Sequence, residues 1–131
     1  MTKEQIKQTI LVVEDDVSVL NALVDALTRE GFTALRAKDG EEGLRAATEN
    51  HPDLILLDIL MPKMDGITML KKLREDTWGK SVHIMILTNA SDNEKIDEAM
   101  QNEAFEYFLK ANIKIEDVVA KVKAKLNIVS P

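Results

Sequence analysis

Three acidic residues follow the first short aliphatic run of the chain. Glu14, Asp15 and Asp16 come directly after residues 10–13. Two like charges about 4 Å apart repel by on the order of 4 kcal/mol at an effective dielectric of 20, so such a cluster resists joint ionisation without a cation. Mg²⁺ would meet this need, because it takes oxygen ligands. The plainer interpretation is helix capping, and we expect Asp16 to cap a helix that begins near Val17.

Three later aliphatic runs end on residues that could handle a phosphoryl group, namely Asp58, Thr88 and Lys110. Residues 61–66 follow Asp58 with a proline and a final glycine, which is typical of a tight, fixed loop. An aspartate fixed beside a metal is a candidate covalent acceptor. Thr88 could donate a hydrogen bond to a phosphoryl oxygen, and Lys110 could pair with its charge. Taken singly, each of the three is more often structural or solvated, so the hypothesis depends on their combination.

Strand-like and helix-like patterns alternate along the chain. Short runs rich in Ile, Val and Leu are typical of strands buried on both faces of a parallel sheet. The predicted strands are residues 10–14, 32–36, 53–58, 82–88 and 105–109. The predicted helices are residues 17–30, 41–50, 67–76, 91–102 and 115–126, with Gly31 ending the first and a capping box of Ser91 and Glu94 opening the fourth. Five βα units predict an α/β fold whose carboxyl edge gathers the polar residues in one crevice.

Length and composition fit one domain. The chain has 131 residues, of which 45% are hydrophobic, close to the commonest domain size. We expect a flexible segment at residues 1–8, the domain at residues 9–127 and a short tail at residues 128–131. The absence of cysteine suits a reducing cytosol, and no run approaches the roughly 20 apolar residues of a membrane span. These features predict a cytoplasmic protein that does not bind a membrane. The net charge of −6 argues against direct binding of nucleic acid.

Four segments together resemble the response-regulator receiver domain. They are residues 10–16 (ILVVEDD), 54–66 (LILLDILMPKMDG), 86–88 (ILT) and 107–110 (YFLK). The resemblance covers nearly the whole chain, and the order and spacing of the segments make it specific. It implies a flavodoxin-like (βα)5 doubly wound fold with a five-stranded parallel sheet. It also implies two-component signalling, in which Asp58 accepts a phosphoryl group from the phosphohistidine of a sensor histidine kinase or phosphotransfer protein.

The resemblance assigns roles to individual residues. Those that hold Mg²⁺ would be Asp15 and Asp58 directly, Glu14 through water, and Leu60 through its backbone carbonyl. Those that sense the phosphoryl group would be Thr88, Lys110 and the switch aromatic Tyr107. The output face would comprise the fourth helix, fifth strand and fifth helix, about residues 91–126, for a downstream protein partner or a phosphorylation-dependent dimer. On that face we expect Met100, Phe105 and Tyr107 to be partial core rather than contact residues.

The sequence departs from the family pattern at several positions. Ala111 replaces the usual proline after the lysine, Asn89 replaces a small residue after the hydroxyl and narrows access, and Glu103 replaces a glycine, which predicts a reshaped turn. Leu60 and Ala90 stand at two positions that influence hydrolysis, and neither can position an attacking water. These two residues suggest a comparatively long-lived phosphoryl state.

Two other classes of protein share part of this pattern but lack residues that they require. A haloacid-dehalogenase-like phosphatase needs a second acid two residues after its nucleophile, where this chain has Leu60. A flavodoxin-type electron carrier needs a hydroxyl-rich phosphate loop after the first strand, where acids would repel the FMN phosphate. The remaining alternative is a receiver-like adaptor that binds proteins constitutively and is never phosphorylated. We expect a stand-alone regulator that is no enzyme beyond catalysing its own phosphorylation and dephosphorylation.

Overall fold

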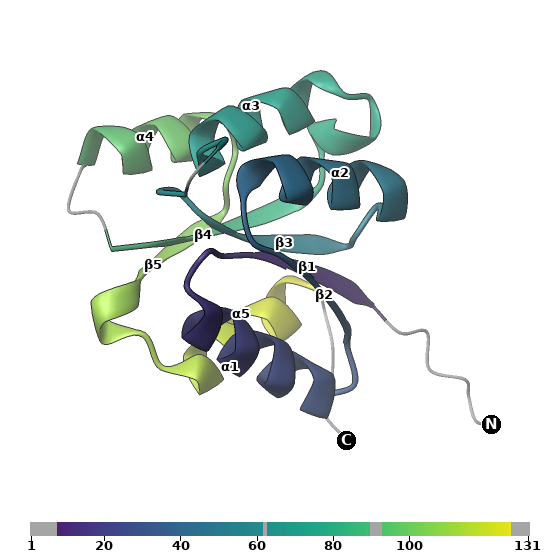
Figure 1. Ribbon diagram of the computed structural model, residues 1–131, viewed down its shortest axis with the longest axis vertical. Helices are drawn as coiled ribbons and strands as arrows, with labels where there is room; N and C mark the ends of the chain where they lie inside the picture. The colour runs from purple at the N-terminus through teal and green to yellow at the C-terminus, as the bar shows by residue number, and fades with distance from the viewer. Residues whose placement is uncertain (1–7, 62, 90–92, 127–131) are drawn as a thin grey trace.

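Five parallel strands form a single sheet in the order β2-β1-β3-β4-β5 (Figure 1). The computed structural model describes residues 8–61, 63–89 and 93–126. The strands are β1 (Thr9–Val13), β2 (Thr33–Ala37), β3 (Leu54–Asp58), β4 (His83–Thr88) and β5 (Glu106–Leu109). This sheet confirms the predicted flavodoxin-like fold, and each strand lies within one residue of its predicted bounds.

Helices cover both faces of the sheet, with α1 and α5 on one side and α2, α3 and α4 on the other (Figure 1). They are α1 (Val17–Arg29), α2 (Gly40–Asn50), α3 (Gly66–Glu75), α4 (Asn93–Gln101) and α5 (Ile115–Lys125), with short 3-10 turns η1 (Trp78–Lys80) and η2 (Lys110–Asn112). Ser91, the predicted cap of α4, lies outside the described residues, as do the predicted terminal segments apart from Gln8. Within the described ranges, no helix has the length and apolar character needed to cross a membrane.

The core forms two layers because the central strands bury both of their faces. On the side of α2, α3 and α4, residues such as Leu11, Ile55 and Ile84 are fully buried. On the side of α1 and α5, the fully buried residues include Ile10 and Met85. Strands flanked by helices on both faces need apolar residues at every position, which is why the pattern does not alternate.

Aspartates cap the three helices that follow β1, β2 and β3. Asp16, Asp39 and Asp65 accept first-turn amide hydrogen bonds at 3.0, 2.8 and 2.8 Å for α1, α2 and α3. Helix N-termini leave amide donors without intrahelical partners, and these carboxylates satisfy some of them. The caps therefore fix the helix starts at the carboxyl edge of the sheet.

The end of α4 and the edge strand β5 carry more exposed apolar surface than the sequence predicts. Met100 and Tyr107 are 38% and 42% exposed, and Leu109 is 40% exposed, so the partial-core prediction is wrong for Met100 and Tyr107. Tyr107 is in register with Ile86 on the α4 face of the sheet, and α4 leaves this part of the edge strand uncovered. Phe105, in contrast, is half-buried and packs against the core of the α1 and α5 layer.

The turn between α4 and β5 is strained at one residue and tied down by another. Glu103, at the position where glycine is usual, has a left-handed φ of 70°. The Arg74 guanidinium donates to the backbone carbonyls of Gly79, Val82, Asn102 and Glu103 at 2.7, 2.8, 2.9 and 3.2 Å. The turn thus takes up the glycine-type conformation without a glycine.

Replacing Glu103 by Gly is expected to raise the free energy of unfolding by about 0.5–1 kcal/mol, because glycine adopts a positive φ without steric cost. Urea titration would measure the change. Gly31→Ala is the matched converse, since Gly31 has a φ of 97° and open space around it; this variant should lose about 1 kcal/mol. A loss of stability in Glu103→Gly would contradict the strain at this turn.

An aromatic pair lies at the amino edge of the sheet, where the strands begin. The His51 and Trp78 rings stack with centroids 4.5 Å apart and an angle of 8° between their planes. His51 follows the last residue of α2 with a left-handed φ of 48°. The stack therefore ties the end of α2 to η1, far from the carboxyl edge.

Candidate functional site

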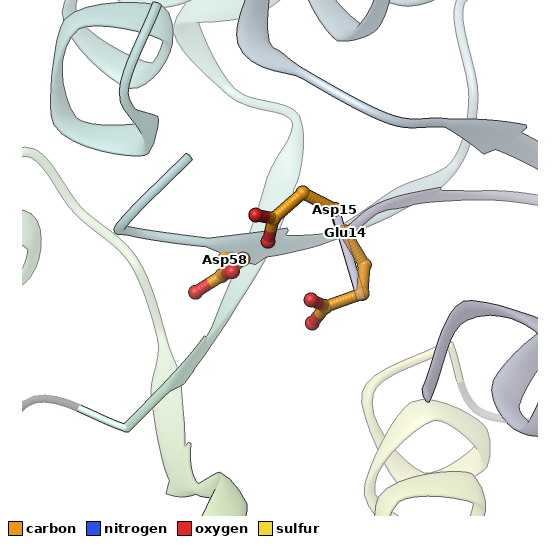
Figure 2. A group of neighbouring side chains, drawn as sticks. All are labelled: Glu14, Asp15 and Asp58. Atoms are coloured by element: carbon orange, nitrogen blue, oxygen red, sulfur yellow. The ribbon is translucent and has the colours of Figure 1, made fainter. Parts of the chain in front are cut away.

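Parallel pairing brings the predicted polar residues to one edge of the sheet. Glu14 and Asp15 directly follow β1, Asp58 ends β3, Thr88 ends β4 and Lys110 directly follows β5. Ligand atoms of Glu14, Asp15 and Asp58 all lie within 4.8 Å of one another. Figure 2 shows these three carboxylates gathered at the carboxyl ends of β1 and β3. The structure therefore assembles the acidic group that the sequence predicts.

Lys110 crosses the edge from β5 to reach two of the acids. Its Nζ donates to Glu14 Oε2 at 2.7 Å and to Asp58 Oδ2 at 3.1 Å, and its side chain is only 9% exposed. Glu14 Oε2 also accepts from the Asp16 amide at 2.9 Å. One ammonium is thus shared between two buried carboxylates.

A cavity of about 240 Å³ opens over this cluster, lined by Asp15, Asp16, Asp58, Leu60, Asn89 and Lys110. A larger hollow of about 620 Å³ lies between α1 and α5, but it contains none of the acidic cluster. The smaller cavity is therefore the candidate functional site, because acidic residues and Lys110 line it.

The comparison with known families agrees with this geometry. A sequence model described as the response regulator receiver domain matches residues 10–123. The chain belongs to the response-regulator receiver family. It is accordingly a receiver domain of the two-component signalling type, and its fold is the one expected of such a domain.

Relatives and solved structures place the receiver domain among proteins of the same kind. It is 37% identical over 123 residues to the DNA-binding response regulator MtrA of Mycobacterium tuberculosis, a match that covers 94% of this chain and 52% of MtrA. This chain spans about half the length of the curated relatives it matches. A CheY-like receiver domain from Methanospirillum hungatei superposes with a TM-score of 0.87 at 26% identity, covering 93% of this chain and 95% of that one. CheY in the CheX-CheY-BeF3-Mg complex of Borrelia burgdorferi gives a TM-score of 0.82 at 27% identity, covering 91% and 89%.

The electrostatics of this receiver domain leave an excess of negative charge. Burial and, to a smaller extent, the charge of Glu14 raise the pKa of Asp58 to about 7, even though the nearby Lys110 ammonium acts to lower it. Burial alone would lower the pKa of Lys110, but its hydrogen bond to Glu14 and the charge of Asp58 outweigh burial and raise it. Lys110 therefore stays protonated, and one ammonium does not balance three acids.

The residues of the cluster fit a hard divalent cation. Receiver domains typically bind Mg²⁺ at an acidic cluster, and this one has such a group in Glu14, Asp15 and Asp58. Glu14 is fully buried, and its Oε1 has no hydrogen-bond partner within the described part of the chain. A buried carboxylate oxygen without a donor is costly unless water or a cation satisfies it.

The other predicted residues lie at different distances from the cavity. Thr88 is fully buried at the end of β4, and Asn89 lies at the cavity wall. Leu60 also lines the cavity and is 49% exposed. Tyr107 does not line the cavity and faces outward on β5. Ala90 lies outside the described residues, so its predicted place beside the site is not described.

The final glycine of the loop after Asp58 predicts a tight connection, but not how closely that glycine packs on Asp58. A Cβ added to Gly66 would lie 2.2 Å from the Asp58 carbonyl oxygen. The Gly66 amide also donates to the Ile59 carbonyl at 2.8 Å. This close return holds the backbone of Asp58 in place, and the final glycine of the loop was the sequence signal for it.

Proposed function

We propose that this receiver domain is a phosphoacceptor switch. Asp58 would take a phosphoryl group from the phosphohistidine of a sensor histidine kinase or phosphotransfer protein. A new O–P bond forms at an Asp58 carboxylate oxygen as the P–N bond breaks, and the electron pair leaves with the imidazole. The observation that carries the proposal is the buried Asp58 carboxylate held by Lys110 at 3.1 Å on the wall of an acidic cavity.

Each carboxylate has a distinct part in this proposal. Asp15 and Asp58 would bind Mg²⁺ directly, Glu14 through water and Leu60 through its carbonyl. The bound cation supplies positive charge to the phosphoryl oxygens. In this proposal the phosphoryl group is added to Asp58 Oδ1, which accepts a long hydrogen bond from the Leu60 amide at 3.4 Å. Lys110 then pairs with the charge of the product.

The phosphoryl group adds roughly −1.5 to −2 charge, which Thr88 and Lys110 would sense. Tyr107 would follow Thr88 and alter the face made by α4, β5 and α5, where Leu109 and Met100 are also exposed. MtrA is named as DNA-binding, but the net charge of −6 of this chain favours output through a protein partner or a phosphorylation-dependent dimer. We propose a cytoplasmic location and no catalysis beyond turnover of its own phosphoryl group.

Incubation with acetyl phosphate and Mg²⁺, followed by intact mass spectrometry, tests the proposal. We expect one phosphoryl adduct that is absent in Asp58→Asn and absent when a chelator removes the metal. Asp65→Asn is a matched control, because asparagine can also cap α3, and it should keep the adduct. A protein that binds Mg²⁺ but never forms the adduct would favour the constitutive adaptor instead.

The apolar wall of the cavity predicts a slow loss of the phosphoryl group. Leu60 lines the cavity without a polar group that could orient an attacking water. The double variant Leu60→Asn with Ala90→Glu is expected to lose its phosphoryl group about tenfold faster, since polar groups that hydrogen-bond and position the attacking water assist hydrolysis. Time-resolved mass spectrometry would measure the decay. Met100→Asn, similarly exposed on α4, is the control, and equal decay of all three proteins would reject the idea.

A further inference from the structure

We propose that Gly40, which lies outside the acidic cavity, is a positioning residue for the Mg²⁺ site. Its role would be to let the start of α2 press against the segment after Asp58 and hold that segment in place. The inference rests on the function proposed above, and it assigns part of the Mg²⁺ affinity to a residue that does not line the cavity.

Gly40 makes backbone contact with the segment after Asp58. It is the buried first residue of α2, and a Cβ added there would lie 2.1 Å from the Met64 carbonyl oxygen and 2.8 Å from the Met64 carbonyl carbon. Side-chain carbons do not approach backbone atoms this closely. Any residue with a Cβ must therefore displace either the start of α2 or the backbone at Met64.

The start of α2 is the better anchored of the two. Asp39 Oδ1 accepts from the Glu42 amide at 2.8 Å, and Glu42 Oε1 accepts from the Lys38 amide at 2.8 Å. Asp39 itself is buried. This reciprocal capping fixes the first turn of α2. A Cβ added at position 40 would therefore displace the backbone at Met64 rather than the start of α2.

The segment at Met64 already carries strain. Lys63 has a left-handed φ of 67°, a conformation that costs residues other than glycine about 1 kcal/mol or more. Its Nζ lies 3.9 Å from Asp39 Oδ2, which links the same two segments a second time. The start of α2 thus supports a conformation that the segment would not prefer alone.

Movement at Met64 would reach the proposed metal ligands. Gly66, two residues further on, donates its amide to the Ile59 carbonyl at 2.8 Å and packs directly on the Asp58 carbonyl. Asp58 and the Leu60 carbonyl are two of the proposed Mg²⁺ ligands. Mg²⁺ demands nearly ideal octahedral geometry, so a shifted ligand set binds it more weakly.

Calorimetric Mg²⁺ titration of Gly40→Ala and Gly79→Ala tests the inference. Gly79 is the matched control, because its added Cβ would also lie 2.1 Å from a backbone carbonyl oxygen, that of Leu73, but at the amino edge of the sheet. Loss of residues that orient metal ligands commonly costs 10–100-fold in affinity. We therefore expect the Kd of Gly40→Ala to rise about tenfold or more, whereas that of Gly79→Ala should stay within about twofold of the unmodified protein.

A second pair of variants covers the case in which Gly40→Ala does not fold. Lys63→Val and Lys63→Gly both remove the contact with Asp39, but only valine disfavours the left-handed φ. Lys63→Val should weaken Mg²⁺ binding several-fold and Lys63→Gly should not. Hydrogen exchange of the Gly66 amide in metal-free protein should be faster in Gly40→Ala and Lys63→Val only. This measurement detects movement of the segment after Asp58 without relying on bound metal.

Three outcomes decide the matter. The positioning role is supported if Mg²⁺ binding weakens in Gly40→Ala but not in Gly79→Ala. If Gly40→Ala does not fold, it is supported if Mg²⁺ binding weakens in Lys63→Val but not in Lys63→Gly. Equal Kd values for Gly40→Ala and Gly79→Ala, or for the two Lys63 variants, overturn it while leaving the proposed function intact. If the unmodified protein binds no Mg²⁺, the proposed function fails first and the inference fails with it.

Discussion

Replacing Lys110 by Met is expected to lower the free energy of unfolding of the metal-free protein by about 3 kcal/mol near pH 8. The Lys110 ammonium is the cation that contacts both Glu14 and Asp58, which are 0% and 2% exposed. Removing one partner of a buried ion pair leaves the other charge uncompensated, which costs far more than losing a surface pair. Urea titration in the presence of a chelator would measure the loss.

The loss should shrink toward about pH 5, because carboxyl groups without their cation take up protons and lose their charge. Lys121→Met is the matched control. Lys121 pairs with Glu106 at 3.1 Å, but its side chain is 53% exposed, so its removal should cost less than about 1 kcal/mol. Equal losses in the two variants would show that the buried ammonium is not the dominant charge at the site.

Replacing Asp58 by Asn is expected to have the opposite effect and to stabilise the metal-free protein by about 2 kcal/mol near pH 8. Burial and the charge of Glu14 raise the pKa of Asp58 from its ordinary 3.8 to about 7 in the folded protein. The folded state therefore holds a proton that the unfolded chain releases between these two values. Stability is lost as the pH rises through this window, and Asn, which does not titrate, avoids that loss.

Two conditions check the sign of this prediction. Near pH 4 the Asp58 carboxyl is neutral in the folded protein, so the advantage of Asn should largely vanish. At pH 8 with saturating Mg²⁺ the unmodified protein gains binding free energy that the variant lacks, and the difference should close or reverse. A variant that is less stable than the unmodified protein in chelator at pH 8 would contradict the raised pKa of Asp58.

The sequence predicted the architecture well because its strongest signals are local. Unalternated aliphatic runs give central strands, and Asp16 and Gly31 mark where α1 begins and ends. Parallel order then places Asp58 and Lys110 at one edge without any knowledge of packing. The acidic cluster follows from strand order alone, whereas the roles of its members as ligands remain proposals.

Features that depend on packing could not be read from the sequence. The sequence predicts Tyr107 and Met100 to be partial core because their side chains are largely apolar, but their exposure depends on how far α4 extends over β5. Glu103 kept the glycine-type φ because the Arg74 guanidinium holds carbonyls from three segments, a contact that no local pattern reveals. The close approach of Gly40 to the Met64 backbone likewise joins residues that are distant in the chain.

The position of the single tryptophan determines what intrinsic fluorescence can report. Trp78 stacks on His51 at the amino edge, and strands of this length separate the amino and carboxyl edges by roughly 15–20 Å. Tryptophan emission should therefore change on unfolding in both stability experiments but should not change when Mg²⁺ binds in the acidic cavity. Any spectral change on adding Mg²⁺ would signal a rearrangement transmitted through the whole length of the sheet.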